Sequence, residues 1–461
     1  MNFKIPEKVN EIIEKLMEHG YEAYAVGGCV RDMILGREPE DWDITTSATP
    51  LEVKRIFRRT VDTGIVHGTV TVLMEKDHYE VTTYRIDGEY EDNRHPKEVS
   101  FTSSLEEDLK RRDFTINAMA YNEKEGFIDL FGGMTDIQNR VIRCVGSAEE
   151  RFQEDALRIL RAIRFAAQLD FEIDERTLSA VKAKAINLQS ISAERIRVEL
   201  TKLLLADHPE RLRVLYEVGI TKVILPEFDA MMITEQKNIH HIYSVGEHTL
   251  RTVSEVAGKL MEHRFNLRER TILRWTMLLH DIEKPNTIST GKDGQHHFYG
   301  HQEKGALTAK HILRRLKFDN DTMDAVVHLI RWHDYRFGLT PAGMRKAMAK
   351  IGKEYMELLF EVNRADTSAK NPMYTSEKYE RLAKARELYE EVMARGECVS
   401  LKELSINGKD LIALGQKPGR ELGNLLDDLL AEVIEKPELN ERDALLNIVK
   451  RKLNEESQND S

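Results

Sequence analysis

The sequence predicts an α+β fold, in which a small mixed α/β head precedes an all-helical remainder. Apolar residues at helical spacing indicate a first helix over residues 4–19. Short strand-like runs follow at 24–26, 42–45, 69–74 and 78–84. The pattern is then helical throughout from about 148 to 217, and helical again over about 235–370 and 375–455. Strands are therefore expected in the first 140 residues.

The length allows several domains, and the pattern divides the chain into four parts. The 461 residues are 41% hydrophobic and 32% charged, which is typical of a soluble globular protein. We expect a head over 1–140, a helical neck over 141–230, a histidine-rich helical region over 235–370 and a helical tail over 371–461. Residues 86–100 are polar and contain Gly and Pro, which predicts a loop.

Charge and cysteine content narrow the class of protein. The formal net charge of −11 argues weakly against a non-specific polyanion binder, although local basic faces decide such contacts. The three cysteines, Cys29, Cys144 and Cys398, lie far apart, so neither a disulfide framework nor a thiolate zinc site is expected. No apolar run approaches the roughly 20 residues that span a bilayer, and the N-terminus does not resemble a secretory signal. We expect a cytoplasmic protein with no membrane partner.

The strongest chemical signal is a glycine pair followed by two spaced aspartates. Gly27 and Gly28 end an apolar run, and Asp41 and Asp43 follow within the same βαβ-sized segment. On a strand, residues two apart face the same side, so both carboxylates would point together. Paired carboxylates suit Mg²⁺, and a glycine turn before a helix suits a phosphate. A turn and a solvated loop are the ordinary alternatives, but the combination indicates nucleotidyl transfer.

Two further polar groups accompany this segment. Arg112 belongs to a pair of arginines beside an aspartate, which on its own is more often a surface ion-pair cluster. Near a phosphate site its guanidinium would match triphosphate oxygens. Glu80 lies in a predicted strand and is either a third carboxylate of the site or an ordinary strand-face residue.

A polar stripe is predicted on one helix of the neck. Asp155, Arg158, Arg161 and Arg164 are spaced three apart, beside apolar positions that indicate a buried face. A salt-bridged solvent face is the alternative. A carboxylate acceptor beside a guanidinium donor matches the Watson–Crick edges of C and A, and mismatches those of U and G. A mismatch would leave polar groups unpaired, which gives strong discrimination.

Together these motifs resemble those of class II CCA-adding enzymes, tRNA nucleotidyltransferases of the polymerase-beta superfamily. The matching segments occur in the family's order and cover the first 200 residues or so, with one more in the tail: Gly27-Gly28-Cys29-Val30-Arg31-Asp32, Asp41-Trp42-Asp43, Arg111-Arg112-Asp113-Phe114-Thr115-Ile116-Asn117-Ala118, Asp129-Leu130-Phe131-Gly132-Gly133, Glu154-Asp155-Ala156-Leu157-Arg158, Ser192-Ala193-Glu194-Arg195-Ile196 and Ser405-Ile406-Asn407-Gly408-Lys409-Asp410-Leu411.

The resemblance implies a role for each matching residue. Asp41 and Asp43, with Glu80 as a candidate third carboxylate, would hold two Mg²⁺ ions. The triphosphate or its sugar would be contacted by Gly28, Arg31 and Arg112. The incoming base would be read by Asp155 and Arg158, supported by Arg161 and Arg164. The implied reaction adds C, C and A to the 3′ end of tRNA from CTP and ATP without a nucleic-acid template, and the tail would bind tRNA.

Two related activities remain as alternatives to full CCA addition: A-only addition to tRNA and poly(A) synthesis. The 86–100 loop corresponds to the family's flexible loop, which CC-only relatives lack, so it favours CCA or A-only addition. Bacterial poly(A) polymerases resemble a Gly-Arg-Arg-Phe type of segment between the two head motifs. Residues 65–70 of this chain read Ile-Val-His-Gly-Thr-Val instead, which places poly(A) synthesis behind tRNA end synthesis.

The histidine-rich region resembles an HD metal-dependent phosphohydrolase domain. An adjacent His-Asp pair on an apolar helix is the signature, and six candidate ligands follow the family's order: His248, His280, Asp281, His301, His333 and Asp366. Imidazoles with a carboxylate bind divalent ions that activate water for attack on a phosphate ester. Glu283 stands where many relatives have glycine, so a reshaped turn is expected.

The implied substrate is a 2′,3′-cyclic phosphate or 3′-phosphate at a damaged tRNA end. An inherited domain that no longer hydrolyses anything is the structural alternative. A stand-alone HD phosphohydrolase with a degenerate head is disfavoured by the intact Asp41 and Asp43. A non-catalytic RNA-binding protein would not need six metal ligands as well as a carboxylate pair.

Overall fold

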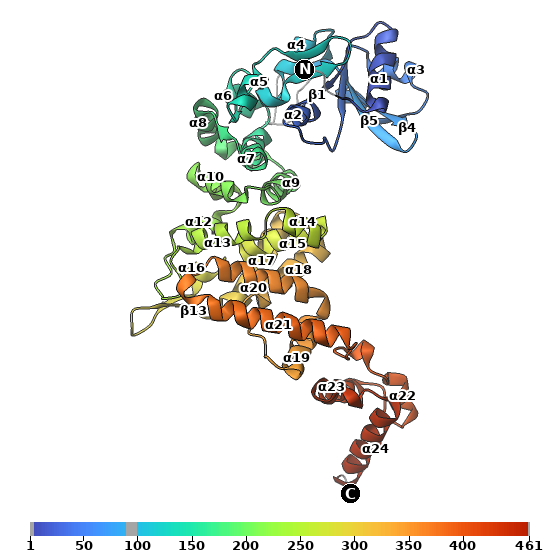
Figure 1. Cartoon of the computed structure of the whole chain (residues 1–461), viewed down its shortest axis with the longest axis vertical. Helices are drawn as coiled ribbons and strands as arrows, with labels where there is room; N and C mark the ends of the chain where they lie inside the picture. The colour runs from blue at the N-terminus through green and yellow to red at the C-terminus, as the bar shows by residue number, and fades with distance from the viewer. Residues whose placement is uncertain (1–3, 89–98, 460–461) are drawn as a thin grey trace. The chain divides into compact units, whose positions relative to one another are not determined.

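The computed structural model describes residues 4–88 and 99–459, and these form two compact units (Figure 1). The first unit comprises Met1–Ala230 with Ala257–Leu260 and Ile312–Phe318. The second comprises Met231–Val256, Met261–His311 and Asp319–Ser461. The predicted fold class is confirmed, because a mixed α/β head precedes a mostly helical body. In the described residues no helix is both long and apolar enough to cross a membrane.

A seven-stranded sheet forms the centre of the head. Its strands lie in the order β3 (Thr60–Gly64), β4 (Thr69–Met74), β5 (Asp77–Thr83), β2 (Asp43–Thr46), β1 (Ala23–Val26), β8 (Met119–Asn122) and β9 (Gly126–Asp129). Neighbouring strands are antiparallel, except that β2 and β5 are parallel. This parallel pair lies in the interior of the sheet and carries the carboxylates of the predicted site.

Helices cover both faces of this sheet (Figure 1). On one face α1 (Glu7–Glu18) and α3 (Pro50–Ile56) pack near the buried side chains of Ile44 and Val81. On the other, Tyr24 and Val26 pack with Leu109 of α4 (Leu105–Lys110). Strand alternation places Asp43 on the same face as Tyr24 and Val26. The remaining head helices are α2 (Gly28–Ile34) and α5 (Gly133–Gln138).

The 129–133 motif builds the start of α5. The carboxylate of Asp129 accepts hydrogen bonds from the backbone N–H groups of Gly133 and Met134, at 2.8 and 2.9 Å. A Cβ atom on Gly133 would lie 2.3 Å from the carbonyl oxygen of Thr115. Glycine is therefore required there, because the helix packs directly against the backbone of the 115–117 turn.

The sequence predicted a neck that is helical throughout, and this prediction is wrong for one short segment. A two-stranded parallel ribbon joins β10 (Val141–Ile142) to β11 (Glu172–Ile173). Residues 172–173 are a strand because they pair with a strand that is distant in the sequence. Hydrophobic periodicity is a local pattern and cannot predict such pairing. The helices around it are α6 (Ala148–Glu154), α7 (Leu157–Leu169), α8 (Glu175–Lys184), α9 (Ala193–Leu204), α10 (Leu212–Glu217), α11 (Thr221–Ile224) and α12 (Pro226–Ile233).

The ends of the predicted 86–100 loop form a short antiparallel ribbon. Here β6 (Arg85–Asp87) pairs with β7 (Val99–Phe101). The middle of the predicted loop, residues 89–98, lies outside the described residues.

Helices build most of the second unit (Figure 1). Four of them pack against one another: α13 (Val245–Glu255), α15 (Leu267–Leu279), α18 (Asn320–Trp332) and α20 (Met356–Ser368). The hairpin β12 (Ile288–Thr290) and β13 (His296–Phe298) again departs from the predicted all-helical pattern. The other helices are α14 (Lys259–Arg264), α16 (Lys284–Thr287), α17 (His301–Arg315), α19 (Pro341–Ile351), α21 (Ser376–Ala394), α22 (Gly408–Ala413), α23 (Arg420–Glu435) and α24 (Arg442–Asn459).

The tail has an apolar core of its own. Leu411, Leu429 and Leu445 are fully buried in a cluster that draws on α22, α23 and α24. The buried guanidinium of Arg345 on α19 donates hydrogen bonds to the carbonyl oxygens of Ile434 and Glu435, at 2.6 and 3.3 Å. These bonds attach α19 to the end of α23.

Candidate functional site

Three carboxylates meet at the parallel strand pair of the head. Asp43 of β2 and Glu80 of β5 are register partners, so their side chains leave the sheet side by side on one face. Asp41 precedes β2, which begins at Asp43, so the predicted strand alternation does not apply to it. The three charges nevertheless interact, which places Asp41 near the other two.

The electrostatics of this group suit a bound cation. Partial burial raises the pKa of Asp43, and Asp41 adds to the rise, whereas the guanidinium of Arg112 opposes it. Burial also raises the pKa of Glu80, with further contributions from Asp43 and Asp41. Carboxylates that repel one another on one sheet face gain stability from a divalent cation between them. The residues present therefore fit a magnesium site.

The glycine pair brings an arginine close to these carboxylates. Gly27 has a φ of +83°, which favours glycine, and a Cβ atom there would lie 3.0 Å from Arg112 Nη1. Helix α2 begins at the next residue, Gly28. The buried guanidinium of Arg31 on α2 donates to both carboxylate oxygens of Asp32, each at 2.9 Å. These hydrogen bonds therefore hold the Arg31 side chain in one orientation on α2.

A buried network links the head to the neck. Asp113 Oδ2 accepts a 2.7 Å hydrogen bond from Arg161 Nε, and its Oδ1 accepts one from Asn117 at 3.2 Å. Asn117 in turn accepts a 2.8 Å bond from Arg31 Nη1. Despite burial, the guanidinium groups of Arg161 and Arg158 lower the pKa of Asp113 to about 2. The ionised Asp113 therefore orients two of the arginines predicted to contact the nucleotide.

The predicted single helical stripe is wrong in one respect. Asp155 is not in the helix of the three arginines but at the break between α6 and α7, with extended backbone angles. From there its Oδ1 accepts the backbone N–H of Leu157 at 3.0 Å, and its Oδ2 accepts Arg195 Nη2 at 2.8 Å. Capping the start of α7 outweighs continuing the helix, a preference that aspartate shows widely.

Most of the predicted nucleotide-contacting residues of the neck nevertheless converge on one pocket. The pocket has a volume of about 230 Å³. Its lining comprises Arg111, Arg112, Asp113, Asp155, Leu157, Arg158, Arg161 and Arg195. Five arginines around two aspartates make it a strongly cationic pocket with fixed acceptors.

Arg164 does not line this pocket. It is buried in an ion pair with Glu199, at 2.6 Å, and its guanidinium stacks 3.9 Å from the ring centroid of Phe165. The same ring lies about 5 Å from the guanidinium groups of Arg31 and Arg161. Arg164 thus packs behind the pocket rather than facing into it.

Sequence reasoning assigned no role to Asp113 and Arg195, although both lie in motifs that carried the resemblance. Asp113 orients Arg161, and Arg195 holds Asp155. The sequence signal that could have indicated their roles is that each is a charged residue inside such a motif. Its partner lies 40 to 48 residues away, which spacing alone does not reveal.

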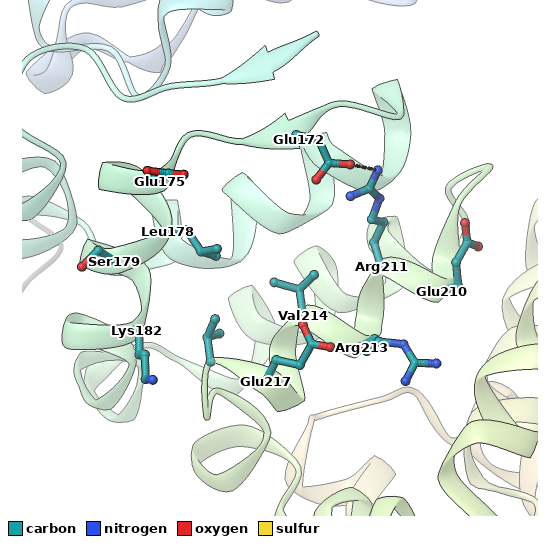
Figure 2. A pocket seen from close by; sticks show the side chains of 11 residues that line it. Glu172, Glu175, Leu178, Ser179, Lys182, Glu210, Arg211, Arg213, Val214 and Glu217 are labelled. Carbon is teal, nitrogen blue, oxygen red and sulfur yellow. Dashed lines mark hydrogen bonds and ion pairs between the residues drawn. The ribbon is translucent and has the colours of Figure 1, made fainter. Parts of the chain in front are cut away.

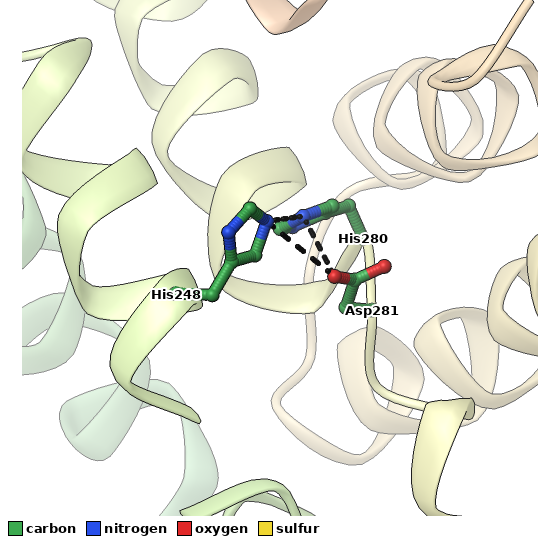
Figure 3. Close-up of side chains that lie close together, drawn as sticks. All are labelled: His248, His280 and Asp281. Carbon is green, nitrogen blue, oxygen red and sulfur yellow. Dashed lines mark hydrogen bonds and ion pairs between the residues drawn. The ribbon is translucent and has the colours of Figure 1, made fainter. Parts of the chain in front are cut away.

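The six histidine-region ligands also converge, from five helices of the second unit. His248 lies on α13, Asp366 lies on α20 and His301 begins α17; the others immediately follow α15 or α18. Two groups of ligand atoms, each within 4.8 Å, share Asp281: His248, His280 and Asp281, and then Asp281, His301 and His333. Figure 3 shows the first of these groups, with both imidazoles directed toward the carboxylate. Asp366 completes the set, 3.0 Å from His248 Nε2.

The imidazoles are oriented as metal ligands. In each of the four histidines Nδ1 lies 2.6 to 3.1 Å from a backbone carbonyl oxygen. Since a carbonyl only accepts, Nδ1 carries the proton and Nε2 keeps its lone pair. The Nε2 atoms of His248 and His280 face each other at 3.4 Å, and those of His301 and His333 at 3.3 Å. Facing lone pairs favour a cation between them.

Burial and the carboxylates support the same conclusion. Burial lowers the pKa of His333 to about 3, and it also lowers that of His248 and His301, so these three rings are neutral near pH 7. Despite burial, the carboxylates of Asp281 and Asp366 raise the pKa of His280. Neither carboxylate oxygen of the buried Asp281 makes a hydrogen bond of good geometry. Lys284 Nζ lies 2.8 Å from Asp281 Oδ2. These donors fit one or two divalent ions.

Glu283 leaves this centre intact. Its φ is −99°, which any residue adopts, so the turn needs no glycine. Its carboxylate accepts hydrogen bonds from Thr308 Oγ1 at 2.6 Å and Asn286 Nδ2 at 3.1 Å. The side chain is therefore held between its own turn and helix α17.

Three segments of the chain match known family models. Residues 23–143 match "Poly A polymerase head domain". Residues 170–232 match "Probable RNA and SrmB- binding site of polymerase A", and residues 301–449 match tRNA nucleotidyltransferase domain 2. These matches cover the head, most of the neck and a large part of the second unit.

Full-length relatives decide the family. The chain is 36% identical to the CCA-adding enzyme of Streptococcus suis over 442 residues, which cover 95% of each chain. The chain belongs to the CCA-adding enzymes. It is also 36% identical to the CCA-adding enzyme of Ligilactobacillus salivarius, with 97% of each chain covered. The solved CCA-adding enzyme of Bacillus stearothermophilus, in complex with CTP, aligns with a TM-score of 0.75 and 31% identity over 99% of this chain and 100% of that one.

Membership of the CCA-adding enzymes makes this chain a tRNA nucleotidyltransferase, as the head motifs predicted. One other sizeable cavity of this CCA-adding enzyme lies in the neck and has a volume of about 740 Å³ (Figure 2). Four glutamates and three cations line it, and Glu172 and Arg211 pair there at 2.7 Å. Its acidic residues outnumber its cations by one, so it lacks the cationic character of the pocket beside Asp155.

Proposed function

We propose that this enzyme adds C, C and A in turn to the 3′ end of tRNA, from CTP and ATP and without a nucleic-acid template. One observation carries the proposal: Arg112 stands between the carboxylate group and the base-sized pocket. It lines the pocket, it lies against Gly27, and its charge acts on Asp43. A nucleoside triphosphate is the ligand that needs a cation between its metal-bound phosphates and its base.

The residues of the head would position the reactants. Asp41, Asp43 and Glu80 would hold two Mg²⁺ ions, and Arg31 and Arg112 would orient the triphosphate. When bound, such ions activate the primer hydroxyl and neutralise the leaving pyrophosphate. The guanidinium of Arg112 adds a fixed positive charge where the triphosphate carries most of its negative charge.

Asp155 and Arg158 would read the base. Each Asp155 oxygen accepts one protein hydrogen bond and retains a second lone pair, which suits the exocyclic amino group of C or A. Arg158 lines the same pocket, and its guanidinium is anchored by Glu154 at 2.6 Å. Uracil and guanine would place a carbonyl against the carboxylate.

Asp155→Ala should therefore relax base choice more than it slows bond formation. We expect incorporation of UTP and GTP, relative to CTP and ATP, to rise by about 100-fold, because unpaired polar groups no longer penalise the wrong base. Competition assays with all four nucleotides measure this ratio. Glu149→Ala, at an exposed site of α6, the helix that ends just before Asp155, serves as the matched control. Complete exclusion of UTP and GTP by Asp155→Ala would refute the assignment.

The overall reaction is tested on three tRNAs that end at the discriminator base, at C and at CC. We expect CTP to be added to the first two and ATP to the third. ATP addition to the CC end alone would make this an A-adding enzyme. Long A tails would indicate a poly(A) polymerase, and incorporation of neither nucleotide would refute nucleotidyl transfer.

A second activity is favoured by the six-ligand centre. We propose that the region 235–370 hydrolyses 2′,3′-cyclic phosphate or 3′-phosphate ends, so that the head 1–140 and neck 141–230 can rebuild CCA on tRNA held in part by the tail 371–461. The orientation of four Nε2 atoms toward a shared carboxylate supports it. Asp281 and Asp366 would hold the metal, and Lys284 would fix Asp281.

A further inference from the structure

A cleft opens beside the six-ligand centre of the second unit. It has a volume of about 900 Å³, and Asp366 contributes to its wall. It shares five lining residues with the cavity directly over the centre: His240, His241, Asp334, Asp366 and Lys370. A molecule that lies in the cleft can therefore present one end to the ligands.

The cleft has a small excess of positive charge, since four cations line it beside three carboxylates: Arg336, Lys370, Lys378 and Arg381 with Asp334, Asp366 and Glu377. Lys370 is paired with Asp366. In the described part of the chain, by contrast, no hydrogen bond or ion pair involves the side chains of Arg336, Lys378 or Arg381. Burial is the main cause that lowers the pKa of Lys378, and the charge of Lys370 adds to it, whereas Asp366 and Asp334 oppose it. Unpaired cations that face one cleft favour an anionic ligand.

Aromatic and apolar surface lies beside these cations. Tyr374 is 42% exposed and Met373 is 83% exposed, and both line the cleft. The ring of Tyr374 packs against His240 at right angles, with 5.6 Å between centroids, which holds it in place. Exposed aromatic rings next to cations are what sites for single-stranded nucleic acid combine.

We propose that this cleft binds the last nucleotides of an RNA strand, with backbone phosphates on Arg336, Lys378 and Arg381 and a base against Tyr374. The inference rests on the proposed hydrolysis, for which it names the substrate class. The centre would then act on the 3′ end of a polynucleotide in preference to a free small phosphate ester, because a small ester does not reach the three cations.

The test compares the full-length wild type with the triple variant Arg336→Gln, Lys378→Gln, Arg381→Gln. Lys384→Gln is the control, since Lys384 lies on α21 together with Lys378 and Arg381 but pairs with Glu387. A pentaribonucleotide that ends in a 3′-phosphate is used to inhibit hydrolysis of bis(p-nitrophenyl) phosphate. We expect its inhibition constant to rise by about 30-fold in the triple variant and its salt dependence to weaken, while kcat for the small ester changes less than about twofold.

Other outcomes separate the two proposals. An unchanged inhibition constant, or a loss of kcat for bis(p-nitrophenyl) phosphate as large as the rise in the inhibition constant, would overturn the cleft assignment and leave hydrolysis standing. If the wild type hydrolyses neither bis(p-nitrophenyl) phosphate nor the 3′-phosphate of the pentaribonucleotide, the proposed hydrolysis fails. The cleft is then judged by photocrosslinking of a 4-thiouridine pentanucleotide. We expect a crosslink to the peptide that contains Met373 and Tyr374, weakened in the triple variant, and its absence would overturn the inference.

Discussion

Asp43→Asn is expected to abolish nucleotide addition to tRNA, by more than about 1,000-fold in kcat, with both CTP and ATP. The amide keeps the size of the side chain but removes one negative charge from the strand pair where Asp43 and Glu80 leave the sheet together. The two Mg²⁺ ions that we propose for this site would require the summed charge of these carboxylates. Single-turnover addition of labelled CTP to tRNA without its CCA end measures the loss.

Asp77→Asn is the matched control for this variant. Asp77 begins β5, the strand that carries Glu80, but it pairs with Lys8 at 2.8 Å, outside the carboxylate group. It should retain full activity. The folded state of Asp43→Asn is checked by its thermal unfolding, which should match the wild type within a few degrees. Substantial nucleotide addition by Asp43→Asn would contradict the metal assignment.

Asp281→Asn should remove both the metal that we propose for the six-ligand centre and the proposed hydrolysis of bis(p-nitrophenyl) phosphate. Asp281 is shared by both groups of ligand atoms, so its loss affects every ion of the centre, whereas His333→Ala removes a ligand from only one group. We expect hydrolysis to fall by more than about 100-fold in Asp281→Asn. Elemental analysis of the desalted protein should show near-complete loss of metal in Asp281→Asn and partial loss in His333→Ala.

Addition of CTP to tRNA by the same preparations is the internal control. We propose that the head carries this activity, so CTP addition should survive both substitutions if the chain remains folded. Asp321→Asn, at an exposed position of α18, controls for the loss of one carboxylate. Equal metal content in wild type and Asp281→Asn would refute the centre. Metal loss with unchanged hydrolysis would place the hydrolytic activity elsewhere.

Much of the head followed from local sequence signals. The helix over 4–19 and the four strand runs appear within a few residues of their predicted bounds, as α1, β1, β2, β4 and β5. Gly27 was recognisable because a left-handed turn before a helix favours glycine, and its φ of +83° agrees. The strands β3, β8 and β9 of the sheet were not predicted. The short strand β11 was also missed, since it is supported by a partner strand 31 residues earlier.

The candidate site also combines features that local sequence predicts with features that only distant contacts decide. Sequence alone supplied the ligand types and their motifs, because carboxylates, imidazoles and guanidinium groups have characteristic chemistry wherever they stand. Whether Glu80 belongs beside Asp43 depended on the register of two parallel strands. The position of Asp155 depended on a helix break and on Arg195, 40 residues away.

What this sequence determined by itself is therefore the set of reactive groups and the local turns that expose them. Those properties depend on residue type and near neighbours. The tertiary structure decided which groups meet: His248 and Asp366 are 118 residues apart and 3.0 Å from each other. It also decided which cations stay unpaired, as around the cleft of Arg336 and Lys378. Contacts between distant segments depend on the packing of whole elements, and no local pattern encodes them.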